Sequence, residues 1–87
     1  MIRYWFKFRL SIEDNPPLGT LLGCGVTAAT KDKALAMLKR SVFKNRELPE
    51  IDECIENVDV STLEENHVRP NMGNPTITGI WFPLGYS

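Results

Sequence analysis

The amino-acid sequence predicts an α+β fold, a two-layer sandwich with one main helix on a mainly antiparallel sheet of about four strands. Three patterns lead to this prediction. Apolar and polar residues alternate near the N-terminus, an apolar stripe at helical spacing runs through residues 31–44, and residues 76–84 are rich in Thr, Ile, Trp and Phe. The predicted order is strand, strand, helix, strand, strand. A chain of 87 residues accommodates one core, so we expect a single domain over residues 1–87.

The first predicted strand spans residues 2–12, where apolar and polar side chains alternate with a period of two. Such alternation is typical of a strand that is buried on one face only. We expect the inward side chains to be Ile2, Tyr4, Phe6, Phe8, Leu10 and Ile12. We expect the outward side chains to be Arg3, Trp5, Lys7, Arg9 and Ser11.

A loop and a second strand are predicted next. Residues 13–19 include two consecutive prolines, which lack the backbone donor that a strand ladder requires, so we expect a loop there. The second strand is predicted over residues 21–28. Within it, Gly23 and Gly25 indicate a bulge or a place where another backbone comes close.

One main helix is predicted over residues 31–44. Thr30 is expected to be its N-cap, and Asp32 suits the positive end of the helix dipole. The apolar side chains of this segment fall in one stripe at helical spacing, which predicts packing against the sheet. They are Ala34, Leu35, Met37, Leu38 and Val42.

The second half of the chain has weaker patterns. Residues 50–60 match both helical spacing and a short strand, and we favour the strand. Ser61, followed by Glu three positions later, forms a capping-box pattern that predicts a helical turn over residues 61–65. Residues 70–75 are rich in turn formers and are predicted as a loop, before a last strand over residues 76–84.

Charge is divided unevenly along the chain. Residues 1–46 hold nine Lys and Arg against three Asp and Glu, a net charge of +6, whereas the remainder holds one against eight, a net charge of −7. All eight of these acids lie in residues 47–65, without a Lys, Arg or His among them. They cannot all be neutralised locally, so we expect a negative patch that speeds encounter with a basic protein. A solvated face that only keeps the protein soluble is the alternative.

This patch leads to a predicted site for a protein partner, such as a basic toxin or nuclease domain. We expect the acids to steer and pair with cations, while exposed aromatic side chains near the C-terminus supply contact area. Strand alternation places Trp81 on the face opposite its neighbours and therefore suggests that it is exposed. The predicted partner-binding residues are Asp52, Glu53, Glu56, Asp59, Glu64, Glu65, Trp81 and Tyr86.

A nucleic-acid-binding module is the alternative from another class. An aromatic side chain among cations, as in the row Arg3, Trp5, Lys7 and Arg9, is typical of platforms for single-stranded RNA or DNA. A net charge of −1 and a pI of about 5.7 count against it. Cross-strand pairing of these cations with Glu50, Asp52 or Glu56 also explains the pattern.

We expect no enzymatic activity, metal site or cofactor. Gly23 to Ala28 has the spacing of a G-x-G-x-x-A dinucleotide turn, but a strand is predicted where that turn needs a helix. Cys24 and Cys54 fit neither a zinc knuckle nor a redox pair, so we expect reduced thiols. A small enzyme that pairs a cysteine with His67, the single histidine, is the third hypothesis.

The sequence also leads to expectations about where the protein is located and how it assembles. Charged residues recur every few positions after Met1, so we expect neither a signal peptide nor a membrane span. We therefore expect a cytoplasmic protein that does not bind membranes. An exposed edge strand leaves both a monomer and a homodimer open.

Several segments resemble known bacterial proteins. The chain is similar to a group of short uncharacterised bacterial proteins in several segments. These are residues 2–10, Gly23 to Ala28 with the following Lys33–Ala36, Val58–Leu63 and Gly79–Pro83. That resemblance implies no catalytic residues. In size and charge pattern the chain is also similar to immunity proteins of bacterial toxin systems, including contact-dependent growth inhibition, which implies a cytoplasmic inhibitor that masks a basic toxin surface.

Overall fold

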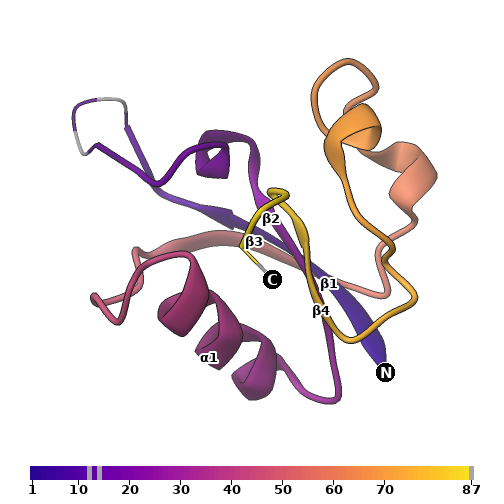
Figure 1. Cartoon of the computed structure of the whole chain (residues 1–87), viewed down its shortest axis with the longest axis horizontal. Helices are drawn as coiled ribbons and strands as arrows, with labels where there is room; N and C mark the ends of the chain where they lie inside the picture. The colour runs from indigo at the N-terminus through magenta and orange to yellow at the C-terminus, as the bar shows by residue number, and fades with distance from the viewer. Residues whose placement is uncertain (12, 14, 87) are drawn as a thin grey trace.

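The computed structural model describes residues 1–11, 13 and 15–86, and Figure 1 shows their arrangement. Four strands, one helix and three short 3-10 turns are found in this part of the chain. The strands are β1 (Ile2–Phe8), β2 (Cys24–Ala28), β3 (Ile51–Glu56) and β4 (Gly79–Phe82). The helix is α1 (Lys31–Ser41), and the 3-10 turns are η2 (Thr20–Leu22), η3 (Val60–Thr62) and η4 (Arg69–Asn71). Ile12, expected in the first strand, and Asp14, expected in the following loop, lie outside the described residues.

The strands form one antiparallel sheet in the order β3-β1-β2-β4. The long strand β1 lies inside the sheet, paired with β2 on one side and with β3 on the other (Figure 1). Strands β3 and β4 are the edges. The predicted α+β class, with one helix and a four-stranded sheet, is confirmed. Along the chain the helix and strands follow the predicted order β-β-α-β-β.

The first hydrophobic core lies between the sheet and α1. Tyr4, Phe6 and Phe8 of β1 point toward the helix, and the fully buried Ala34 and Leu38 of α1 pack against them. The Thr30 hydroxyl accepts a hydrogen bond from the backbone N–H of Lys33, at 3.2 Å, which confirms the predicted N-cap. The inward face predicted for residues 2–8 and the helical stripe are therefore both correct.

A second hydrophobic core lies on the opposite face of the sheet, where the sequence predicted solvent. Residues 58–72 fold across this face, on the side away from α1 (Figure 1). Their apolar side chains cover Trp5 of β1 and Trp81 of β4, whose rings stack at a centroid distance of 5.8 Å. The side chains of this core are Trp5, Val58, Leu63, Val68, Trp81 and Phe82. Alternation along β1 is preserved, but both of its faces are covered.

The glycines before and in β2 make room for the two indole rings. A Cβ on Gly25 would lie 2.4 Å from Cη2 of Trp81, and a Cβ on Gly23 would lie 2.4 Å from Cζ2 of Trp5. Gly23 also has φ +133°, a conformation that side chains disfavour. A bulge in the pairing with β4 lies between Gly25 and Val26. The predicted bulge is therefore present, but the groups that approach the glycines most closely are side chains.

Several element boundaries differ from the prediction because side chains bond to nearby backbone. The second strand begins at Cys24, since the Gly23 N–H donates to the Thr20 carbonyl and closes η2, while the Thr20 hydroxyl donates to the Pro17 carbonyl just before that turn. The last strand begins only at Gly79, since Asn74 Oδ1 accepts from the N–H of Thr76 and closes a turn.

The boundaries around α1 and β3 follow backbone conformation. Helix α1 ends at Ser41, and the chain then passes through positive φ at Lys44 and Asn45. Strand β3 lies within the segment favoured as a strand and ends at Glu56, before Asn57 with φ +53°. The predicted helical turn over 61–65 is instead the 3-10 turn η3, one residue earlier, and its cap is Asp59 because Asp59 Oδ1 accepts from the N–H of Ser61.

Candidate protein-binding site

Strand β3 presents an acidic edge to solvent. Among the described strands it pairs with β1 alone, so the backbone groups on its outer side face no described strand. Asp52, Glu53 and Glu56 are all exposed on this strand. We use the name acidic edge for β3 with these three carboxylates.

Arg9 neutralises part of this charge. It follows β1 and lies beside the start of β3, where its guanidinium contacts Glu50 at 2.9 Å and Asp52 at 2.8 Å. The hydrogen bond to Asp52, followed by the charges of Asp52 and Glu50, raises the pKa of Arg9. The cross-strand pairing considered for Glu50 and Asp52 is thus present.

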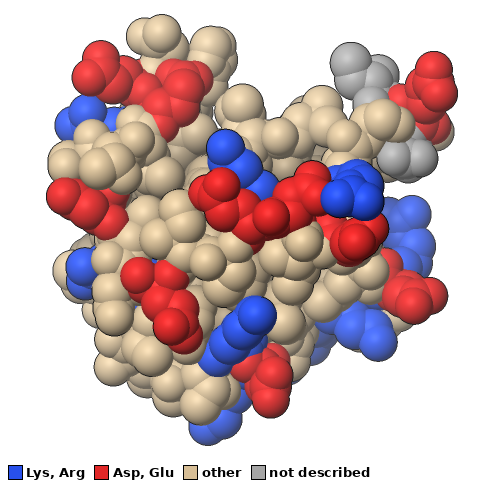
Figure 2. Space-filling view, turned by 180° about the vertical axis from the view of Figure 1, so that it is seen from behind, with Lys and Arg blue, Asp and Glu red and all other residues tan. Residues whose placement is uncertain are grey.

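Glu53 and Glu56 remain without an ion pair among the described residues. Glu53 lies directly opposite Lys7 in the sheet without forming an ion pair with it, and Glu56 lies opposite Tyr4. The face seen in Figure 2 carries a row of acidic side chains with basic ones among them. The negative patch is therefore smaller than the sequence predicts, but part of it is left after folding.

The acids of residues 59–65 are held mainly within their own segment. Glu64 accepts from the ring Nδ1 of His67 at 2.6 Å and from the backbone N–H of His67 at 2.9 Å, and the ring contact is the main reason why its pKa is lowered. The pKa of Asp59 is lowered chiefly by the hydroxyl of Ser61. Glu65 lies 3.7 Å from Arg69. These carboxylates are exposed, but they already stabilise local turns.

The two predicted aromatic contacts have different outcomes. Trp81 is only 2 % exposed, and its indole N–H donates to the hydroxyl of Thr27 at 3.1 Å, so the expectation of an exposed contact is wrong. Tyr86 is half-buried, and its hydroxyl donates to the carbonyl of Leu18 at 3.0 Å. Of the pair, only Tyr86 offers surface to a partner.

The row of cations on β1 does not form the expected exposed platform. Trp5 is 3 % exposed, because residues 58–72 cover it. Arg3 donates to the carbonyl of Val58, and Arg9 is bound to the acids of the β3 side, which leaves Lys7 as the exposed cation of the row without an ion pair in the described chain. A nucleic-acid base therefore has no exposed face of the Trp5 indole to stack on.

Cys24 and His67 lie on different faces of the sheet. Cys24 is buried in the core beneath α1, and burial raises its pKa to about 12. His67 is exposed on the segment that covers the other face. Cys24 and Cys54 are both free thiols. Within the described residues, no group of three or more His, Cys, Asp or Glu is placed to hold a metal ion.

A large apolar hollow, which was not predicted from the sequence, lies beside the second core. Its volume is about 630 Å³, and it lies between η2, the C-terminal residues 82–86 and His67. Leu18, 88 % exposed, and Leu84, 56 % exposed, form part of its wall. One feature of the sequence points to such an apolar surface, since residues 70–87 contain no charged side chain.

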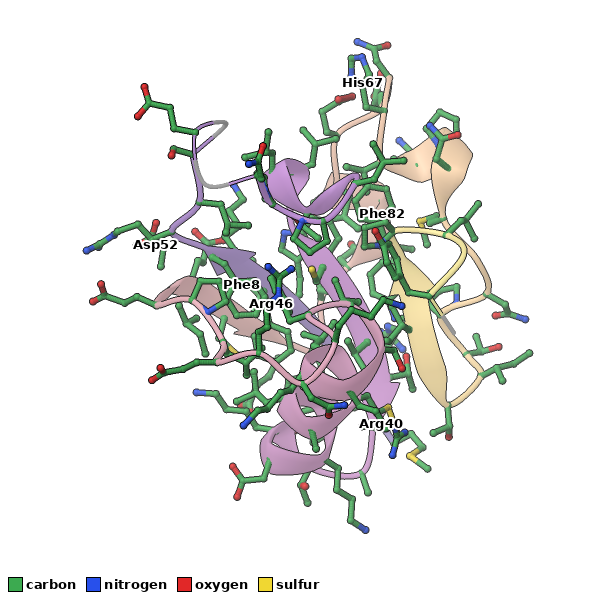
Figure 3. The ribbon with its side chains drawn as sticks, turned by 60° about the vertical axis from the view of Figure 1, so that its left-hand side comes forward. Phe8, Arg40, Arg46, Asp52, His67 and Phe82 are labelled. Atoms are coloured by element: carbon green, nitrogen blue, oxygen red, sulfur yellow. The ribbon has the colours of Figure 1, made fainter. Side chains whose placement is uncertain are left out.

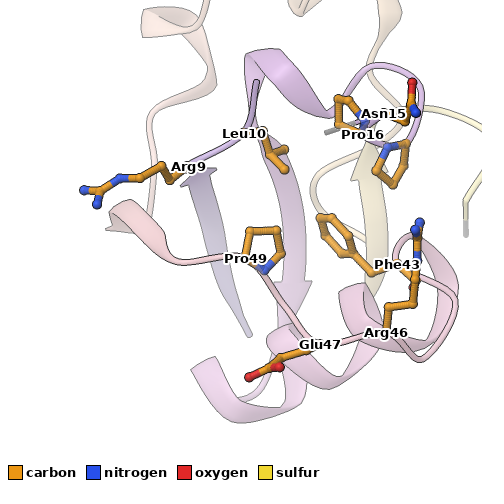
Figure 4. A pocket seen from close by; sticks show the side chains of 9 residues that line it. Arg9, Leu10, Asn15, Pro16, Phe43, Arg46, Glu47 and Pro49 are labelled. Carbon is orange, nitrogen blue, oxygen red and sulfur yellow. The ribbon is translucent and has the colours of Figure 1, made fainter. Parts of the chain in front are cut away.

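A smaller hollow of about 200 Å³ lies between the end of β1 and the turn after α1. Figure 4 shows Phe43 and Pro16 on its walls, while the side chains of Arg9 and Glu47 extend away from it. The Nε of Arg46 donates to the Phe43 carbonyl. This hollow therefore presents mainly apolar walls.

None of the described helices has the length and apolar character needed to cross a membrane. In comparisons with known proteins, no family model, no curated protein and no solved structure matches this chain. The candidate site is therefore defined by the geometry and charge of this chain alone.

Proposed function

We propose that this chain is a protein-binding inhibitor, an immunity protein that neutralises a bacterial toxin by covering a basic surface such as that of a nuclease. The observation that carries the proposal is the acidic edge. There, Glu53 and Glu56 are exposed on a strand with a free outer side, and neither forms an ion pair with the described cations.

The acidic edge has two properties that suit such a partner. Glu53 and Glu56, which form no ion pair with the described cations, attract a basic surface and raise the rate of encounter. Its free backbone groups are able to pair with an extended segment of the partner, a mode in which main-chain hydrogen bonds supply affinity. Arg9 keeps Asp52 partly neutralised, so we assign the electrostatic role chiefly to Glu53 and Glu56.

A protective role for these charges is the competing explanation. Charged side chains on an edge strand also discourage pairing between copies of a protein. The two explanations differ in their consequences, because the protective role affects aggregation and the inhibitory role affects a specific partner.

The test compares the wild type with the double variant Glu53→Lys and Glu56→Lys. Partners are captured from the bacterium that encodes the chain at about 50 mM salt, where surface charges are weakly screened. Each captured protein is then expressed alone and together with the chain. We expect one of them to arrest growth alone, the wild type to restore growth, and the double variant to bind it at least about tenfold more slowly.

The matched control is the double variant Glu13→Lys and Glu47→Lys. It has the same net charge of +3, compared with −1 for the wild type, but places the change away from β3. This control should restore growth as the wild type does. If no captured protein is toxic, or if the β3 variant neutralises the toxin as well as the wild type, the proposal is wrong.

A further inference from the structure

Two hollows lie side by side on the face of the sheet that residues 58–72 cover only in part. The first has a volume of about 290 Å³ and lies beside β3, with Trp5, Ile55 and Leu63 among its walls. The second is the apolar hollow of about 630 Å³ next to Tyr86. Leu18, Leu22 and Leu84 expose apolar side chains in the walls of the second hollow.

Three contacts place the two hollows next to each other, and we treat them together as one groove. Leu22 of η2 lines both of them. Trp5 of the first and Phe82 of the second have ring centroids 5.7 Å apart. Glu64 of the first is hydrogen-bonded to His67 of the second, and Figure 3 shows His67 at the top of the molecule and Phe82 below it, in the upper half of the view.

The two ends of this groove differ in chemistry. The end beside β3 carries two carboxylates, Glu53 and Glu64, against the single ammonium of Lys7. The other end has no Lys, Arg, Asp or Glu among its described lining residues. Its walls include Leu18 and Leu84, which are more than half exposed. The groove is therefore acidic at one end and apolar at the other.

We propose that the groove binds an extended segment of a protein partner with Lys or Arg at one end and apolar side chains at the other. The cations would meet Glu53 and Glu64, while the apolar side chains would cover Leu18, Leu22 and Leu84 and remove them from water. A nucleic acid does not fit this groove, because its phosphates would meet the carboxylates. The inference rests on the proposed function for the identity of the partner, but it adds an apolar surface that meets the acidic edge at Glu53.

The test uses a library of random peptides of about 12 residues displayed on phage and selected on the wild-type chain. Enriched peptides are synthesised, and their affinity is measured by fluorescence anisotropy. We expect enriched sequences to combine Lys or Arg with a cluster of apolar residues. Their affinity should fall at least about tenfold for Leu22→Asp, and by a smaller factor for Glu64→Gln.

Two further variants keep the test interpretable. Leu18→Asp changes a side chain that is 88 % exposed, so this variant should fold. It replaces Leu22→Asp in the test if Leu22→Asp does not fold. Ile77→Asp is the matched control, because Ile77 is an exposed apolar residue, 63 % exposed, that does not line either hollow. Ile77→Asp should bind the peptides as the wild type does.

The inference is overturned if selection enriches no such peptide, or if the enriched peptides bind Leu18→Asp as tightly as the wild type. Failure of the groove can be distinguished from failure of the proposed function. Toxin neutralisation that survives Leu18→Asp and Leu22→Asp would leave the acidic edge in place and reject the groove. Peptide binding in the groove without any toxin partner would support the groove and reject the proposed function.

Discussion

At the scale of single residues, two glycines determine how the second core forms. Trp81 lies against Gly25 and Trp5 lies against Gly23, so the two indoles approach the β2 backbone closely and stack on each other. The indole N–H of Trp81 bonds to Thr27 of the same strand. A motif that resembles a dinucleotide turn in spacing thus has a packing role.

Replacing Gly25 by Ala should destabilise the protein. The added Cβ would lie 2.4 Å from the Trp81 ring, which is 2 % exposed and stacks on Trp5, and overpacking of this kind costs about 1–3 kcal/mol. Gly73→Ala is the control, since its Cβ would meet its nearest neighbour, Leu84, at 3.4 Å. Urea denaturation measures both variants. Equal midpoints for Gly25→Ala and wild type would contradict this packing.

At the scale of elements, residues 58–72 form a cover that has little regular structure but defined anchors. Its apolar side chains enter the second core, while Asp59 and Glu64 each accept hydrogen bonds that close a turn. The pKa of each carboxyl is lowered by these bonds. The stabilisation they provide is therefore present above the ordinary pKa and is lost as pH falls through the lowered one.

The cover should loosen in acid, as the pH falls from the ordinary carboxyl pKa of about 4 through the lowered pKa values of Asp59 and Glu64. Amide hydrogen exchange across residues 58–72 should become faster over this interval before exchange in the central strands β1 and β2 does. Asp59→Asn removes one titrating group while keeping an acceptor for Ser61, so this variant should have a weaker pH dependence. Exchange in the cover that stays constant across the interval would show that these carboxylates do not stabilise it.

At the scale of the whole molecule, one sheet carries a core on each face. The helix packs on one face and residues 58–72 on the other, and β1 and β4 contribute side chains to both. The Trp rings lie only in the second core, whereas the helix covers only the first. Because the sheet is shared, we expect the two cores to unfold together.

Chemical denaturation followed by two signals tests this coupling. Tryptophan fluorescence reports on the second core, and circular dichroism at the helical minimum reports mainly on α1. The two curves should have the same midpoint and slope. A fluorescence transition at lower urea than the helical one would mean that residues 58–72 detach while the first core stays folded.

Part of the candidate site was predictable from sequence. Acids concentrated in residues 47–65 are a local property of the chain, and Glu53 and Glu56 keep their exposure in the structure. Which cations meet them depends on strand order, so the binding of Asp52 by Arg9 follows from the pairing of β1 with β3. The groove could not be predicted, because it requires η2 and the cover to lie on one face.

The sequence by itself determined the α+β class, the helix with its Thr30 cap and the inward face of β1. These features follow from periodicity and capping, which act between residues close together in the chain. Tertiary structure alone decided that Trp5 and Trp81 are buried, and which carboxylates remain free of ion pairs. Both depend on contacts between residues far apart in the chain. Local periodicity shows that a strand has two faces, but only packing determines what covers each of them.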